Sequence, residues 1–179
     1  MRSAPVALAL LALLLAPARA SARAPEALRA RIVAAARRQL GRPFQGDCSA
    51  FVLSLFGAAR MRVGLAPGRS RSESLFRATR RVTAPRPGDL AFFHDTYDRD
   101  RDGRANDPYT HVALVERVEG DAIVLVHRGR RGVERIRMDL ARPSDPTLND
   151  RVRHLRRDPP GTPVLAGELF SAFGSVLPR

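Results

Sequence analysis

The chain has 179 residues, of which 44% are hydrophobic, so it is long and apolar enough for one domain with a single core. This composition excludes a wholly disordered chain. The formal net charge is +13, and because the sequence contains no lysine, arginine supplies all of the Lys/Arg charge. No helix-turn-helix, zinc-finger or aromatic-studded sheet signature accompanies it, so we expect anionic polymers or surfaces as partners and no nucleic acid.

The first twenty residues predict a signal peptide. Arg2 precedes an apolar run from Val6 to Ala16, and this run of roughly 11 residues is shorter than the ~20 that a membrane span requires. Ala18 and Ala20 fit the small-x-small cleavage rule. We therefore expect residues 21–179 to form a single exported domain, periplasmic or extracellular, without a transmembrane segment.

Three helices are predicted in the first half of the mature chain. Apolar residues recur at every fourth position over residues 25–40, which predicts an amphipathic helix that Gly41 ends. Asp47 is a suitable N-cap for a second helix over residues 48–56. A shorter helix is expected over residues 72–81.

The second half of the chain predicts an antiparallel sheet and a closing helix. Short apolar runs bounded by turn residues predict strands at 90–93, 111–118, 122–128 and 132–138. Residues 164–177 read as an amphipathic helix. Helices followed by an antiparallel sheet, with a C-terminal helix, indicate an α+β fold.

The only cysteine, Cys48, opens the second helix. A cysteine in an exported chain that has no disulfide partner is either a small core residue or a reactive thiol. The unpaired amide groups and the positive end of a helix dipole favour a thiolate at this position. The sequence alone leaves both readings open.

Two histidines can reach a common site through the predicted hairpin. If the link 119–121 sets Val118 opposite Ala122, His111 and His127 share a face as diagonal neighbours, at a Cβ separation of roughly 7–8 Å. A one-residue slip would place them on opposite faces. In the favourable register Cys48 is the nucleophile, His111 the base and His127 the residue that orients it. The alternative is a pair of surface or structural histidines, which is also what we expect of His94 and His154.

Three motifs occur in an order that resembles the NlpC-type cysteine peptidases of bacterial cell walls, relatives of the CHAP amidases. They are GDCSAFV (46–52), RPGDLAFF (86–93) and HVALVERV (111–118). The resemblance implies a papain-like α+β fold, with N-terminal helices packed on the antiparallel sheet. It implies Cys48, His111 and His127 as the catalytic residues of a peptidoglycan endopeptidase or amidase, which hydrolyses stem-peptide amide bonds through a thioester.

The resemblance also identifies where this chain differs. Many members of the family have a tyrosine where this chain has Phe44, which cannot donate a hydrogen bond. Gln45 or a backbone amide is then expected to assist the oxyanion, and Phe44, Gln45 and Ser49 are the expected substrate or oxyanion residues. The expected partners are peptidoglycan, its stem-peptide fragments and anionic wall polymers, bound by a monomer; a catalytically silent wall-binding module of the same fold is the alternative.

The polar insertion before His111 predicts a calcium loop. Asp98, Asp100 and Asp102 alternate and are followed by Gly103, as at positions 1, 3, 5 and 6 of an EF-hand loop. The later positions fall to Arg104 (its carbonyl), Asn106 and Asp107, whereas Tyr109 stands where the bidentate glutamate belongs. The chemistry at Cys48 needs no cofactor, so this ion would be structural. A solvated turn in which arginines pair with the acids is the alternative.

Overall fold

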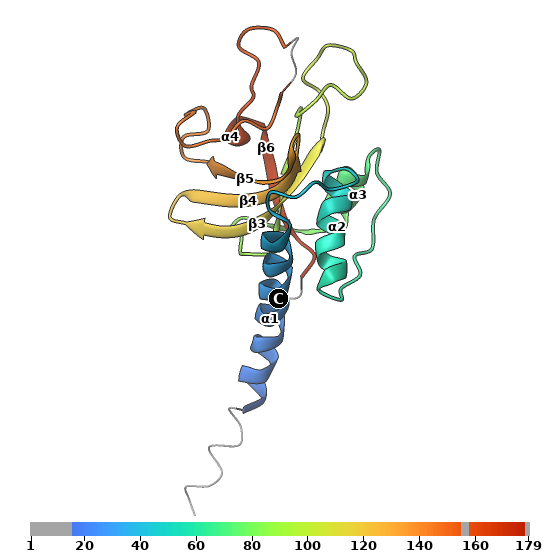
Figure 1. Ribbon diagram of the computed structural model, residues 1–179, viewed down its shortest axis with the longest axis vertical. Helices are drawn as coiled ribbons and strands as arrows, with labels where there is room; N and C mark the ends of the chain where they lie inside the picture. The colour runs from blue at the N-terminus through green and yellow to red at the C-terminus, as the bar shows by residue number, and fades with distance from the viewer. Residues whose placement is uncertain (1–15, 155–157, 178–179) are drawn as a thin grey trace, which may run out of the picture.

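The computed structural model describes residues 16–154 and 158–177 (Figure 1). Residues 1–15 of the predicted signal peptide lie outside this range, while residues 16–20 belong to the first helix. Within the described residues, no helix combines the length and the apolar character that crossing a membrane requires. In chain order, the elements are α1 (Ala16–Gln39), α2 (Cys48–Ala58), α3 (Arg71–Arg77), β1 (Arg80–Val82), β2 (Leu90–Phe93), β3 (His111–Glu119), β4 (Ala122–Gly129), β5 (Gly132–Asp139), α4 (Ala166–Leu169) and β6 (Phe170–Ser175).

The α+β prediction is confirmed, with N-terminal helices on an antiparallel sheet and a C-terminal helix. The six strands lie in the order β1-β6-β2-β3-β4-β5, and neighbouring strands of this sheet run antiparallel. One face of the sheet packs with α1, α2 and α3 around Phe51, Phe56 and Phe92. The opposite face packs with α4 around Leu125 and Met138. Figure 1 shows α1 extending below the sheet and α2 to the right of the strands, next to the upper end of α1.

Two of the predicted helices have different bounds in the structure. α1 continues on the N-terminal side of Pro25, which was expected to start it. α3 ends at Arg77, and residues 80–82 form the edge strand β1 instead of the last turn of a helix. β1 pairs with β6, so a tertiary partner determines the conformation of these residues.

The prediction of one long helix over residues 164–177 was wrong in extent. Only Ala166–Leu169 are helical, and Phe170–Ser175 form β6 between β1 and β2. A side chain at Gly174 would collide with Thr79, since an added Cβ would lie 2.2 Å from Thr79 Oγ1. The close approach that this glycine permits belongs to a packed strand rather than to an exposed turn of helix.

A buried ion pair fastens α1 to the beginning of β2. Arg29 Nη1 lies 2.9 Å from Asp89 Oδ1 and also donates to the carbonyl of Pro87. The other carboxylate oxygen of Asp89 accepts the amide of Arg86 and closes the turn before the strand. The aspartate of the PGDL motif is therefore structural, because it holds β2, and through it β3, at a fixed distance from α1.

Candidate active site

Cys48 is the first residue of α2, and its position is fixed from both sides. Asp47 caps the helix, with its side chain accepting the amide of Ala50 at 2.7 Å. Upstream, two backbone hydrogen bonds join Gly41 and Arg42 to Val133 of β5. The link that carries Cys48 is thus attached to the sheet at one end and ordered by a helix cap at the other.

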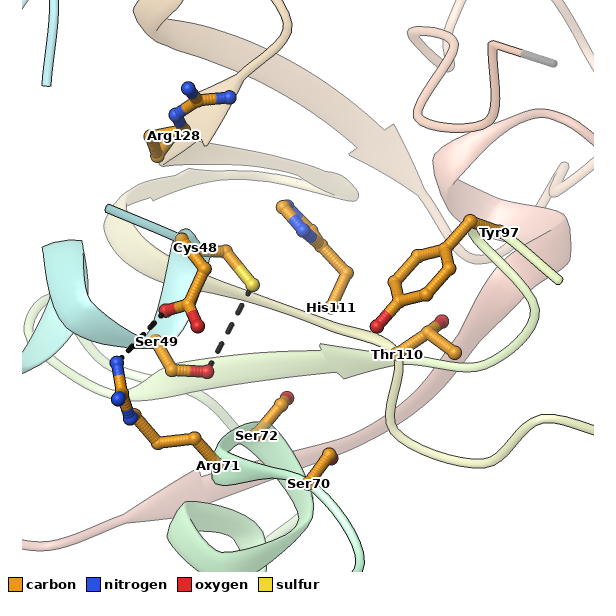
Figure 2. Close-up of a pocket in the computed structure, with 10 residues that line it drawn as sticks. Cys48, Ser49, Ser70, Arg71, Ser72, Tyr97, Thr110, His111 and Arg128 are labelled. Atoms are coloured by element: carbon orange, nitrogen blue, oxygen red, sulfur yellow. Dashed lines mark hydrogen bonds and ion pairs between the residues drawn. The ribbon is translucent and has the colours of Figure 1, made fainter. Parts of the chain in front are cut away.

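Cys48 and His111 line one pocket of about 240 Å³. His111 is the first residue of β3, and β3 packs against α2. Figure 2 shows the Cys48 thiol and the His111 imidazole on adjacent walls of this pocket, with both side chains turned into it. The cysteine is therefore accessible to a ligand from the pocket and is not sealed inside the core.

His111 and His127 contact each other directly, as the predicted register requires. His111 Nε2 lies 2.8 Å from His127 Nδ1, a hydrogen bond between two rings that are nearly perpendicular. The predicted three-residue link was wrong, because Glu119 pairs with Ala122 and leaves a two-residue turn. A β-bulge at Glu116 shifts the register by one residue, so Val115 pairs with Leu125 and the two histidines return to one face.

Burial favours the neutral forms of Cys48 and His111. It raises the pKa of Cys48, and the Asp47 carboxylate raises it further, against the lowering effect of the Val112 amide. Burial also lowers the pKa of His111 to about 4 and lowers the pKa of His127. The structure thus differs from the expected thiolate: the desolvation of Cys48 outweighs the helix terminus, and the resting pair is a thiol beside a neutral imidazole.

The expected oxyanion and substrate residues lie at different distances from the pocket. The amide of Cys48 belongs to the first turn of α2, where N–H groups have no intrahelical acceptor. Ser49 lines the pocket, with its hydroxyl 4.0 Å from Cys48 Sγ. Phe44 packs edge-to-face on Phe51, and neither it nor the exposed Gln45 is among the residues that line the pocket. The position at which the resemblance led us to note a missing tyrosine is thus filled by a core ring.

Among the pocket residues that were not predicted as site residues, two arginines and a tyrosine have the longest side chains. Arg71 of α3 lies 3.5 Å from Asp47, and Arg128 of β4 is half-buried, with one N–H donated to the carbonyl of Gly129. Tyr97 comes from the insertion and lines the same pocket. Arg128 follows a proposed catalytic histidine by one residue, which is the only sequence signal that could have identified it.

The pocket continues past His111 into a basic surface. A second hollow of about 240 Å³ shares Tyr97, His111 and Arg128 with the first and also contacts His127. Beyond it lies a depression of about 650 Å³, the basic trough, which shares Arg130 and His154 with the second hollow. The trough is lined by Arg130, Arg131, Glu134, Arg135, Ile136, Asp150, Arg151 and His154.

Part of the predicted calcium loop gathers its carboxylates. Asp98, Asp100 and Asp107 each offer an oxygen, and these atoms lie within 4.8 Å of one another. Asp98 also accepts the amide of Gly103 at 2.9 Å, which fits the sharp turn of such a loop. Asp102 points elsewhere, because it accepts the amide of Arg104 and the side chain of Asn106.

One of the three gathered carboxylates is less favourable for binding a cation. Asp107 is almost fully buried and forms an ion pair with Arg99 at 3.1 Å. The alternative prediction, a solvated turn in which arginines pair with the acids, included such an ion pair but not the burial. Three converging carboxylates suit a hard cation such as calcium, whereas one of them already has a cationic partner. Three of the six predicted ligands, all of them carboxylates, thus come together.

His94 and His154 lie outside the pocket that holds Cys48. His94 Nδ1 accepts the amide of Tyr109 at 2.9 Å, and burial lowers its pKa, as befits a structural histidine. His154 is exposed at the junction of the second hollow and the basic trough.

No model of a known protein family matches the chain, and no curated protein matches it either.

Proposed function

We propose that this chain is a cysteine hydrolase that cleaves amide bonds in peptidoglycan stem peptides through a thioester. The observation that carries the proposal is the pocket in which Cys48, at the start of α2, faces His111, itself hydrogen-bonded to His127. A nucleophile, a base and an orienting group in this order support acyl transfer. The peptidoglycan substrate rests on the resemblance of the three sequence motifs.

The neutral resting pair favours a general-base mechanism. His111 Nε2 is engaged by His127, so its Nδ1 takes the thiol proton as Cys48 Sγ attacks the amide carbonyl. The Cys48 amide, in the first turn of α2, would donate to the oxyanion. His111 then gives the proton to the leaving amine as the C–N bond breaks. Water attacks the thioester, its proton passes through His111 to sulfur, and the carboxylic acid leaves.

The charge around the pocket supports an anionic substrate. Arg71 and Arg128 line the pocket from different elements, α3 and β4. Within the described residues Arg128 has no carboxylate partner, so its guanidinium is free to form a charge-assisted pair with a ligand. Stem peptides carry free carboxylates, and the basic trough offers room for the longer anionic polymers of the wall.

The decisive experiment compares the products of wild type and Cys48→Ala on defined muropeptides by mass spectrometry. We expect the wild type to release peptides cut at one amide bond and Cys48→Ala to release none. Ser54→Ala, on the same helix, is the control that should cleave normally. Cleavage that persists in Cys48→Ala would refute the mechanism, and binding by both proteins without any cleavage would favour a catalytically silent wall-binding module.

The proposal includes a structural calcium ion in the loop 98–107. Three residues, Pro108, Tyr109 and Thr110, separate this loop from His111 along the chain. Tyr97 precedes the loop and lines the pocket. An ion bound by Asp98, Asp100 and Asp107 would hold both ends of the loop against the site.

A further inference from the structure

The second ring nitrogen of His127 has one acidic neighbour of note. His127 Nε2 is buried and has no hydrogen-bond partner within normal range among the described residues. The carboxylate of Glu134 lies near it, at 3.6 Å from Nε2 to Oε1. Glu134 lies directly opposite His127 in the pairing of β4 with β5, so the strand register brings the two side chains together.

The separation is longer than a hydrogen bond but is easily closed. Glu134 is 43% exposed, and its side chain can therefore rotate without displacing the core. The other acidic group near His127, Asp150, already accepts the amide of Arg137 at 2.6 Å. Glu134 is thus the carboxylate that is free to approach His127.

Gly129 makes the space that Glu134 occupies. A Cβ added to Gly129 would lie 1.8 Å from Glu134 Oε1 and 3.0 Å from His127 Nε2. The conformation of Gly129 is an ordinary strand conformation, so no backbone strain requires glycine there. The structural reason that remains is room for the carboxylate beside the imidazole.

A carboxylate at this position determines where the protons of both rings lie. An ionised carboxylate only accepts, so His127 must carry its hydrogen on Nε2, which leaves Nδ1 as an acceptor in the neutral ring. His111 must then donate from Nε2 to that acceptor. The remaining nitrogen of His111, Nδ1, is consequently a free base, as proton abstraction from Cys48 requires.

We propose that Glu134 is a positioning residue that fixes the tautomers of His127 and His111, and that Gly129 provides the gap through which it acts. This inference rests on the proposed function, because it assigns the fourth group in the series Cys48, His111, His127, Glu134. Glu134 touches no substrate in it and acts only through His127.

The first test is spectroscopic and needs no substrate. Long-range proton–nitrogen spectra of the ¹⁵N-labelled protein report the tautomer of each ring, and the chain has only four histidines. We expect His127 as the Nε2–H tautomer in the wild type, a mixture of tautomers in Glu134→Ala, and the wild-type form in Glu134→Gln, whose amide oxygen can still accept. A wild-type spectrum from Glu134→Ala would overturn the proposal.

The second test measures reaction rates. Glu134→Ala and Gly129→Ala should each lower kcat, and the rate of Cys48 alkylation by iodoacetamide, at least about 10-fold with little change in KM. Gly57→Ala is the matched glycine control, because an added Cβ there meets nothing within 4 Å, and Glu119→Ala is the matched glutamate control on an exposed site. Both controls should react at the wild-type rate.

The outcomes separate this inference from the proposed function. If the wild type cleaves no muropeptide, the proposed function fails, while the tautomers and the alkylation rates still decide the role of Glu134. If cleavage depends on Cys48 but Glu134→Ala retains the wild-type kcat, the positioning role fails and the hydrolase stands. Thermal unfolding of each variant shows whether it is folded. If Gly129→Ala does not fold, Glu134→Ala alone still tests the positioning role of Glu134.

Discussion

His111 and His127 are hydrogen-bonded although the turn that joins their strands, taken alone, would place them on opposite faces of the sheet. The two-residue turn after Glu119 sets a register in which His127 would face Leu114. The extra residue of the β-bulge, Glu116, shifts the pairing by one position before the strands reach the site. The bulge therefore brings the two histidines together, and under the proposed function its stability should affect activity.

Replacing Glu116 should weaken both stability and activity. Its buried carboxylate accepts hydrogen bonds from Arg37 of α1, Arg135 of β5 and the neighbouring Arg117. The arginines are half-exposed and can be rehydrated, so we expect Glu116→Ala to lower the free energy of unfolding by about 1–3 kcal/mol. Urea unfolding measures this, and the exposed Glu119→Ala should change it little.

The pH dependence of stability should carry the signature of Glu116. Hydrogen bonds and ion pairs with the arginines lower its pKa to about 2 from an ordinary 4.5, so its contribution is present above pH 4.5 and is lost as the pH falls toward 2. The wild type should lose this part of its stability over that interval. Glu116→Gln should not, and an equal loss in both proteins would contradict the assignment.

The pH dependence of Cys48 alkylation should be that of a thiol that is neutral at rest. Because burial raises its pKa, alkylation by iodoacetamide should be slow at pH 6 and should accelerate above the ordinary thiol value of roughly 8.5. The low pKa of His111, about 4, places the acid limb of amide hydrolysis near that pH, since the base must be unprotonated. A fast, pH-independent alkylation between pH 5 and 7 would instead indicate a thiolate–imidazolium pair.

The ion pair between Arg29 and Asp89 should contribute strongly to the free energy of unfolding, without taking part in the proposed reaction. Both side chains are almost fully buried, so Arg29→Met leaves an unpaired charge and should cost about 3–5 kcal/mol. Arg29→Met combined with Asp89→Asn should recover much of this loss. Arg38→Met, an exposed arginine on the same helix, is the control for the substitution itself.

Calcium should stabilise the loop before His111. At about one hundred times its dissociation constant, an ion bound only by the folded chain adds about 2.7 kcal/mol, which raises Tm by several degrees in a domain of this size. Asp98→Asn should abolish the rise and Asp121→Asn, in the hairpin turn, should not. Equal Tm and activity in calcium and in chelator would remove calcium from the proposal.

The sequence predicted the helices around Cys48 and the shared face of His111 and His127, because these depend on local periodicity and on parity along a strand. The predicted link between β3 and β4 was one residue too long. The bulge at Glu116 shifts the register back by one residue, so the predicted shared face of the two histidines is still correct. The sequence did not predict β6, since the strand conformation of residues 170–175 depends on the slot between β1 and β2. An isolated glycine, Gly174, was the one local sign of a close approach.

The remaining site residues could not be derived from spacing alone. Arg71 and Tyr97 reach the pocket from α3 and from an irregular insertion, so their positions follow from tertiary packing. Glu134 was accessible in principle, because the two-residue turn between β4 and β5 pairs it with His127. Identifying Glu134 requires the register of the hairpin formed by β4 and β5. The sequence suggests this hairpin but does not specify which residues pair.

The position of β6 in the sheet has a consequence for how the chain reaches its native state. β6 lies between β1 and β2, so β1 has no partner strand and β2 is paired only with β3 until residues 170–175 have been synthesised. The sheet therefore cannot be completed progressively from the N-terminus, and its unpaired edges stay exposed to other chains in the meantime. Folding should be slow for a domain of this size, because closing the sheet requires contacts between distant parts of the chain.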